Sequence, residues 1–132
     1  MKLKLFVFAA LIAVVMLAGF QQGAFAKGGG TKTIIALAPG ADFSNAKGKA
    51  VYKVNGTERE FQVEVENIKK LAGKTVKVYV NGTLIGGATV DSLGEARLNR
   101  NTELGQSVPF IQTGDVVQVK TNLGKVIVSG KF

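Results

Sequence analysis

Residues Arg59 to Glu66, which read Arg-Glu-Phe-Gln-Val-Glu-Val-Glu, decide the fold class of this chain. Phe61, Val63 and Val65 alternate with polar side chains, so one face of the segment is apolar and the other is wet. Alternation with a period of two indicates a β-strand, and a strand with one wet face is typical of an antiparallel sheet. The segment therefore predicts an antiparallel β-structure.

Segments of the same kind recur along the chain, separated by turn residues. Asn55-Gly56 and Asn81-Gly82 are hairpin signals, because both residue types tolerate the positive φ of a type I′ turn. Gly86-Gly87 predicts a bulge or a close backbone approach. The predicted strands cover residues 33–38, 48–54, 59–66, 75–80, 83–90, 95–99, 115–121 and 125–131.

About eight short strands at regular spacing indicate a β-sandwich or a small barrel. We expect the sandwich: a single all-β, antiparallel domain of immunoglobulin-like or transthyretin-like character over residues 33–132. The segment 27–32 is rich in glycine and predicts a flexible leader in front of it.

The first 26 residues predict a secretory signal peptide. Lys2 and Lys4 form its basic start, residues 5–20 are uncharged, and Ala24-Phe25-Ala26 supplies the small residues that a signal peptidase requires. The apolar run is shorter than the ~20 residues that span a bilayer. We therefore expect cleavage after Ala26 rather than an anchor, no membrane span afterwards, and a secreted or periplasmic location.

The chain contains no cysteine and no histidine. Their absence removes Ser-His and Cys-His nucleophile pairs and the usual nitrogen and sulfur ligands of zinc and copper. Glu60, Glu64 and Glu66 fall on the wet face of one strand, which favours a solvated face over a pair of catalytic carboxylates. We expect neither an enzyme nor a cofactor or metal site.

Two sets of residues are candidates for binding. The first is an interaction patch made by the apolar run in loop 100–114 together with the outward ring of Tyr79: Val108, Pro109, Phe110, Ile111 and Tyr79. The alternative for the run is a loop that tucks onto the core.

The second candidate set is basic. The chain has 17 Lys and Arg against 9 Asp and Glu, and such a balance favours phosphate or acidic polymers as partners. The densest local set, in and after loop 67–74, is Lys69, Lys70, Lys74 and Lys77. A generic cationic surface that aids solubility is the alternative.

The expected function is that of an exported, non-catalytic interaction or structural protein of the cell envelope or extracellular matrix, bound to an envelope or matrix protein or an acidic polymer. One alternative is a self-assembling subunit, a homo-oligomer in which residues 33–38 add to a neighbour's sheet edge. Another is a binder of polyanions, either acidic polysaccharide or nucleic acid. Asn55 and Asn81 also fit the N-glycosylation pattern, which matters only in an organism that makes the modification.

Two stretches carry a family resemblance. Residues 75–98, with Val76-Lys77-Val78-Tyr79-Val80 and Gly94-Glu95-Ala96-Arg97-Leu98, resemble the transthyretin-like, carboxypeptidase-regulatory-like β-sandwich modules. Residues 37–66, with Gly48-Lys49-Ala50-Val51-Tyr52, are similar in cadence to the opening of chordin-type (CHRD) domains, without the histidine motif of that family. Both resemblances imply an extracytoplasmic β-sandwich used for adhesion or structure, and neither assigns a functional residue.

Overall fold

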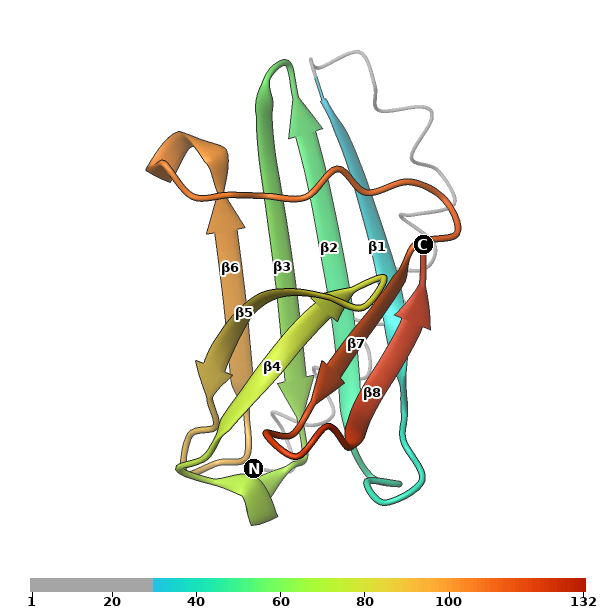
Figure 1. Ribbon diagram of the computed structural model, residues 1–132, viewed down its shortest axis with the longest axis vertical. Coiled ribbons are helices and arrows are strands. Elements are labelled where there is room, and N and C mark those ends of the chain that lie inside the picture. Colours follow the sequence, from blue (N-terminus) through green and yellow to red (C-terminus); the bar gives the residue numbers. More distant parts are fainter. Residues whose placement is uncertain (1–29) are drawn as a thin grey trace.

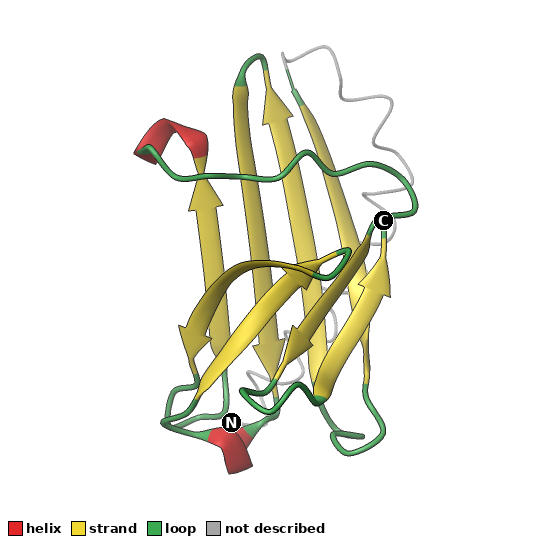
Figure 2. Ribbon diagram, in the orientation of Figure 1, coloured by secondary structure: helices red, strands yellow, loops and turns green. Residues whose placement is uncertain are grey.

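The computed structural model describes residues 30–132, so the predicted signal peptide and residues 27–29 of the predicted leader lie outside the described residues. The described chain is built of β-strands with two short 3-10 helices, which confirms the all-β prediction (Figures 1 and 2). Every predicted strand is present, although the first begins at Thr31, inside the predicted leader. The elements are β1 (Thr31–Pro39), β2 (Lys47–Asn55), β3 (Glu58–Glu66), η2 (Lys69–Leu71), β4 (Thr75–Val80), β5 (Thr83–Thr89), β6 (Ala96–Asn101), η3 (Thr102–Leu104), β7 (Val116–Lys120) and β8 (Val126–Lys131).

All the strands belong to one eight-stranded antiparallel sheet, in the order β5-β4-β7-β8-β1-β2-β3-β6. β1 joins its two halves, because Thr31–Leu37 pairs with β2 whereas Ala38–Pro39 pairs with β8. The sheet curves until its edge strands β5 and β6 come into contact, so that it is nearly closed into a barrel (Figure 1). The antiparallel prediction is confirmed, and the finer expectation of a sandwich stays a prediction.

One side chain bridges the seam between β5 and β6. Nη2 of Arg100 in β6 donates a hydrogen bond to the carbonyl oxygen of Ile85 in β5 at 3.1 Å. Gly86 permits this approach, since a Cβ there would stand 2.8 Å from the same nitrogen. The pairing of β5 with β4 shifts register beside Gly86, which confirms the predicted bulge.

The interior is apolar because each strand turns alternate side chains inward. Phe61, Val63 and Val65 of the quoted segment are 0%, 1% and 3% exposed and belong to a single core cluster. Removing a ring such as that of Phe61 from a filled core costs about 3–5 kcal/mol. The core therefore fixes which face of every strand is left for contact with partners.

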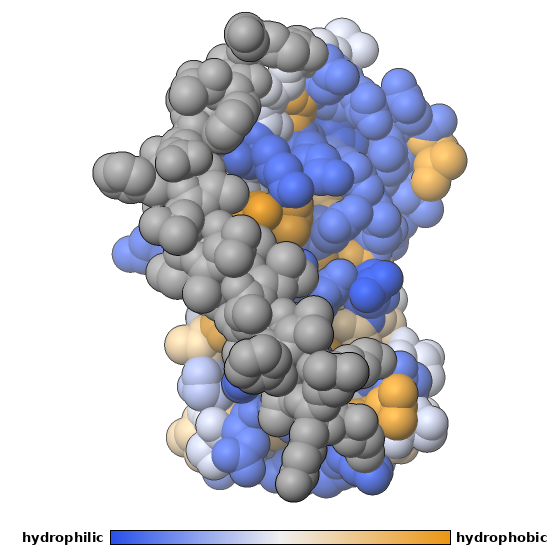
Figure 3. All heavy atoms as spheres, turned by 180° about the vertical axis from the view of Figure 1, so that it is seen from behind, coloured by the Kyte–Doolittle hydropathy of each residue, from blue (hydrophilic) through white to orange (hydrophobic). Residues whose placement is uncertain are grey.

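The outward face of β2 and β3 carries charges matched in pairs. The lysines of β2 stand directly opposite glutamates of β3: Lys47 with Glu66, Lys49 with Glu64 and Lys53 with Glu60. The Nζ to Oε1 distance is 3.8 Å for Lys49 and Glu64 and 3.7 Å for Lys53 and Glu60. Seen from behind, the visible upper part of the described surface is mostly hydrophilic (Figure 3).

The two Asn-Gly hairpins adopt different turns. Asn81 and Gly82 have φ values of 49° and 81° and occupy the two central positions, as a type I′ turn requires. Asn55 instead pairs with Glu58, so that Gly56-Thr57 forms the loop and only Gly56 has a positive φ, of 62°. That pattern is typical of a type II′ turn. The prediction of a type I′ turn at Asn55-Gly56 is therefore wrong.

Candidate functional site

The apolar run of residues 108–111 does not form one exposed patch. Val108 is buried in the core, and Ile111 packs partly against it. Pro109 is half-buried, and Phe110 alone in the run is exposed, at 73%. Tyr79 lies elsewhere, on the outward face of β4. The structure thus tucks most of the run onto the core and does not bring the predicted interaction patch together.

Phe110 covers a guanidinium group. Cζ of Arg59 lies 3.9 Å from the centroid of the Phe110 ring, and Nη2 of Arg59 donates to the carbonyl oxygen of Val108 at 3.0 Å. Because the face of a ring attracts a cation, Arg59 fastens this loop over one end of the barrel. The exposed ring therefore has a structural role, which the sequence does not reveal because Arg59 and Phe110 are distant along the chain.

The predicted basic cluster, Lys69, Lys70, Lys74 and Lys77, is divided between elements. Lys69 and Lys70 belong to η2, Lys74 precedes β4, and Lys77 points outward from β4. Nζ of Lys70 lies 4.4 Å from the centroid of the Phe43 ring and donates a hydrogen bond to the carbonyl oxygen of Asp42 at 3.0 Å, so this amine already has a hydrogen-bond partner. The cluster in sequence is therefore not one cluster on the surface.

Lys77 instead joins lysines from distant parts of the chain on a surface that we call the cationic face. It consists of outward side chains of β4, β7 and β8, namely Lys77, Tyr79, Gln118, Lys120 and Lys131. Lys77 stands directly opposite Lys120, and Tyr79 stands opposite Gln118. Neither Asp nor Glu occurs in β4, β5, β7 or β8. Sequence reasoning missed Lys120 and Lys131 because only the pairing of strands brings them beside Lys77.

The cationic face is left without counter-charges by the described residues. None of the ion pairs among those residues involves Lys77, Lys120 or Lys131. Nζ of Lys120 lies 5.0 Å from the centroid of the Tyr79 ring, a cation–π contact. The face thus offers amines and one aromatic ring to an anionic partner.

Asp115, at the start of β7, is held by its own partners. Nδ2 of Asn81 donates to its Oδ1 at 2.9 Å, and the backbone N–H of Gln112 donates to its Oδ2 at 2.8 Å. These two bonds, that from Asn81 first, hold the pKa of Asp115 below its ordinary value of 3.8. The carboxylate therefore serves the turn at Asn81 rather than the lysines of the cationic face.

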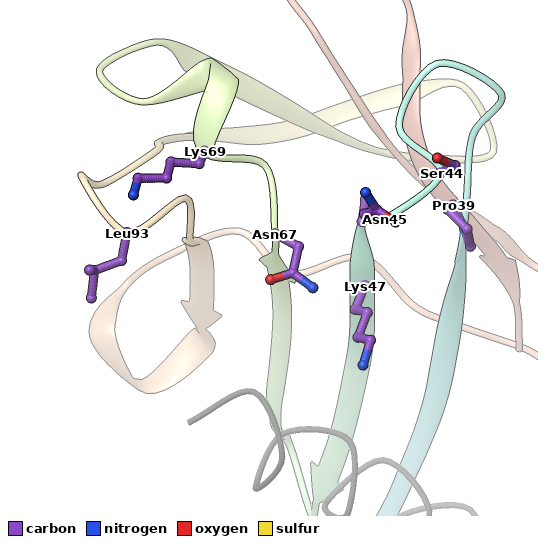
Figure 4. Close-up of a pocket in the computed structure, with 8 residues that line it drawn as sticks. Pro39, Ser44, Asn45, Lys47, Asn67, Lys69 and Leu93 are labelled. Atoms are coloured by element: carbon purple, nitrogen blue, oxygen red, sulfur yellow. The ribbon is translucent and has the colours of Figure 1, made fainter. Parts of the chain in front are cut away.

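A second feature is an open hollow of about 760 Å³ where β1, β2 and β3 meet their loops (Figure 4). Among the described residues, its lining contains lysine, asparagine and serine side chains and no carboxylate. The lining residues are Pro39, Ser44, Asn45, Ala46, Lys47, Asn67, Lys69 and Leu93. Lys69 is the one member of the predicted basic cluster that contributes to it.

Comparison with known proteins gives no relative: no protein-family model matches the chain, and no curated protein matches it. Within residues 30–132, no three acidic, histidine or cysteine side chains gather as metal ligands would. No helix in that part of the chain has the length and hydrophobicity to cross a membrane.

Proposed function

We propose that this chain is an exported, non-catalytic binding protein that holds an acidic polysaccharide of the cell envelope or extracellular matrix on its cationic face. The observation that carries the proposal is the direct opposition of Lys77 and Lys120 on strands that contain no acidic residue. Like charges opposite each other in a sheet destabilise it, on a scale of about 0.2–1 kcal/mol. A polyanion bound across the two amines would replace their mutual repulsion with attraction to the ligand.

The spacing of the lysines favours an extended polymer over a single small anion. Lys131 stands opposite Val116, at the other end of β7 from Lys120. At about 3.3 Å per residue, the backbone positions of Lys120 and Lys131 lie roughly 13 Å apart along the strand direction. Repeated charges on a chain can meet both positions at once.

The single aromatic ring on the face favours a polysaccharide over nucleic acid. Single-stranded nucleic acid is usually held by several rings on which successive bases stack. Tyr79 is the one ring among the residues of the cationic face, and its amphipathic ring suits the apolar face of one sugar. The predicted signal peptide supports an extracytoplasmic partner, and the immunoglobulin-like or transthyretin-like sandwich stays part of the proposal.

Strand exchange is less well supported as an alternative. β1 already pairs with β2 along Thr31–Leu37 and with β8 at Ala38–Pro39. Donating this strand to a neighbour would first break both ladders in the middle of the sheet.

Retention on immobilised heparin tests the proposed function. We expect the Lys77→Gln/Lys120→Gln variant to elute at clearly lower salt than the parent protein. The matched control is Lys49→Gln/Lys53→Gln, which removes the same charge from lysines that face glutamates, and it should elute close to the parent. Equal shifts in the two variants would mean that net charge alone drives retention, and tighter retention on single-stranded DNA than on heparin would redirect the proposal to nucleic acid.

A further inference from the structure

The hollow at the end of β2 and β3 is built from two copies of the same tripeptide pattern. Asn45-Ala46-Lys47 enters β2, and Asn67-Ile68-Lys69 leaves β3. The central residues Ala46 and Ile68 are 3% and 1% exposed and belong to the core. Because the central side chain of each triplet points inward, the flanking asparagine and lysine are left on the surface, where all four line the hollow.

The polar side chains of the hollow make no hydrogen bond or ion pair with the described chain, although Lys47 stands opposite Glu66 in the β2–β3 ladder. Asn81 and Asn101, in other turns, use their amides to bind backbone or side-chain groups. Among the described residues, no hydrogen bond or ion pair engages the side chains of Asn45, Asn67 or the two lysines of the hollow. Figure 4 shows Asn67 and Lys47 extending from the neighbouring ends of β3 and β2. These donors and acceptors are therefore available to a ligand.

The hollow is held in shape by its backbone. Asn67 has a φ of 68°, in the left-handed region that asparagine adopts more readily than most residues with a side chain. The backbone N–H of Ile68 donates to the carbonyl oxygen of Gly94 at 3.0 Å, which ties the loop carrying Leu93 to η2. A Cβ at Gly94 would lie 2.5 Å from the backbone nitrogen of Lys69, so only glycine allows this approach. The segment of Asn67 and Lys69 and the loop carrying Leu93 are thus held in place without a ligand.

We infer that the hollow is a second binding site, and that it takes a sugar acid: a hydroxyl-rich ring that carries one carboxylate. Lys47 and Lys69 supply the positive charge for the carboxylate. Amides both donate and accept hydrogen bonds, so Asn45 and Asn67 suit the ring hydroxyls. Pro39 lines the hollow with apolar surface, and its volume lies within the range of small-molecule sites, roughly 300–1,000 Å³.

This site stands apart from the cationic face, since the two surfaces share no residue. The inference therefore does not depend on the proposed function. A monomeric sugar acid can occupy the hollow whether or not a polymer binds to β4, β7 and β8.

Titration of ¹⁵N-labelled protein with D-glucuronate tests the site, with D-glucose and acetate as separate arms. We expect saturable shifts of the Asn45 and Asn67 side-chain amide signals with glucuronate. Binding should be at least about tenfold weaker for glucose, which loses the charged hydrogen bonds of the carboxylate, and for acetate, which loses the hydrogen bonds of the ring hydroxyls. Asn67→Gly removes the amide while permitting the same φ, and should weaken glucuronate binding by about tenfold. Lys69→Gln should do the same.

Three results would overturn the inference. They are the absence of saturable shifts in the hollow, acetate binding as tight as glucuronate binding, and unchanged affinity in both variants. The Lys77→Gln/Lys120→Gln variant should bind glucuronate like the parent, and Asn67→Gly should keep its heparin retention. Each proposal can therefore fail without the other.

Discussion

The same four residues, Val-Asn-Gly-Thr, close two hairpins of this protein and form two different turns. At residues 80–83, Asn81 occupies the left-handed region, and its amide is held on both sides: Nδ2 donates to Asp115, and Oδ1 accepts from the backbone N–H of Val116 at 2.9 Å. At residues 54–57, the side chain of Asn55 has no such partner among the described residues, and the loop moves on by one position. A local turn preference is therefore realised only where distant groups support it.

Charge favours the observed register of the first hairpin by one cross-strand pair. With Asn55-Gly56 at the centre of the turn, Lys49 would stand opposite Gln62, whereas Lys47 and Lys53 would still face glutamates, Glu64 and Glu58. The register that forms instead places each lysine of β2 on the outward face opposite a glutamate. Cross-strand pairs of opposite charge contribute roughly 0.2–1 kcal/mol each, so the additional pair of Lys49 with Glu64 favours the observed register by an amount of that size.

Matched alanine substitutions should separate the two hairpins most strongly. Asn81→Ala loses two side-chain hydrogen bonds and keeps a φ that alanine resists, so we expect a loss of about 2–3 kcal/mol in the free energy of unfolding. Asn55→Ala should change that free energy by no more than about 0.5 kcal/mol. Urea denaturation measures both. Asn81→Gly, which tolerates the φ, should recover part of the loss, and equal losses at the two positions would contradict our account of the turns.

A charge-reversal cycle at Lys53 and Glu60 tests whether ion pairs set the register of the first hairpin. Each single reversal should lower the free energy of unfolding by up to about 1 kcal/mol, because it places like charges opposite each other. The double variant Lys53→Glu/Glu60→Lys should regain most of that loss. Losses that simply add would show that the pair has no coupling and that another contact selects the register.

The smallest expected effect is on the stability of the fold at acidic pH, and it involves the second hairpin alone. The pKa of Asp115 is lowered in the folded state, chiefly by the bond from Asn81, so its carboxylate stabilises the fold fully above the unfolded pKa, near 3.8. That contribution is lost as the pH falls further, through the lower folded pKa. The stability difference between the parent and Asp115→Asn should shrink below about pH 4 in thermal unfolding scans. A stability difference that stays constant down to pH 2 would show that the Asp115 carboxylate does not stabilise the turn.

The strands could be predicted from the sequence because their signal is local. Phe61, Val63 and Val65 reveal their strand by alternation alone, and the other strands follow the same rule. The turn at Asn55 could not be predicted, because its register depends on which lysines meet which glutamates across the hairpin. Closure of the sheet was equally hidden, since the contact between β5 and β6 includes the bond from Arg100 to Ile85 but no backbone ladder that a strand pattern could indicate.

The candidate sites were predictable only in part, for the same reason. The sequence points to Lys77 and Tyr79, but Lys120 comes from β7, and only strand order places it beside them. The sequence places Lys69 in a basic cluster, whereas in the structure Lys69 lies in η2 and lines the hollow with Asn67. Residues adjacent in sequence alternate between the two faces of the sheet, and the residues beside a given side chain on one face come from other strands.

The seam between β5 and β6, which the bond from Arg100 to Ile85 bridges, is the weakest strand boundary of the nearly closed barrel. Every other strand boundary is a backbone ladder, while this one depends on a long side chain whose Nε is buried without an acceptor among the described residues. We expect thermal breathing to start along this line, with β5 swinging away while the remaining ladders persist. Such opening would expose the edges of both β5 and β6. At high protein concentration, we therefore expect molecules to associate first through these edges.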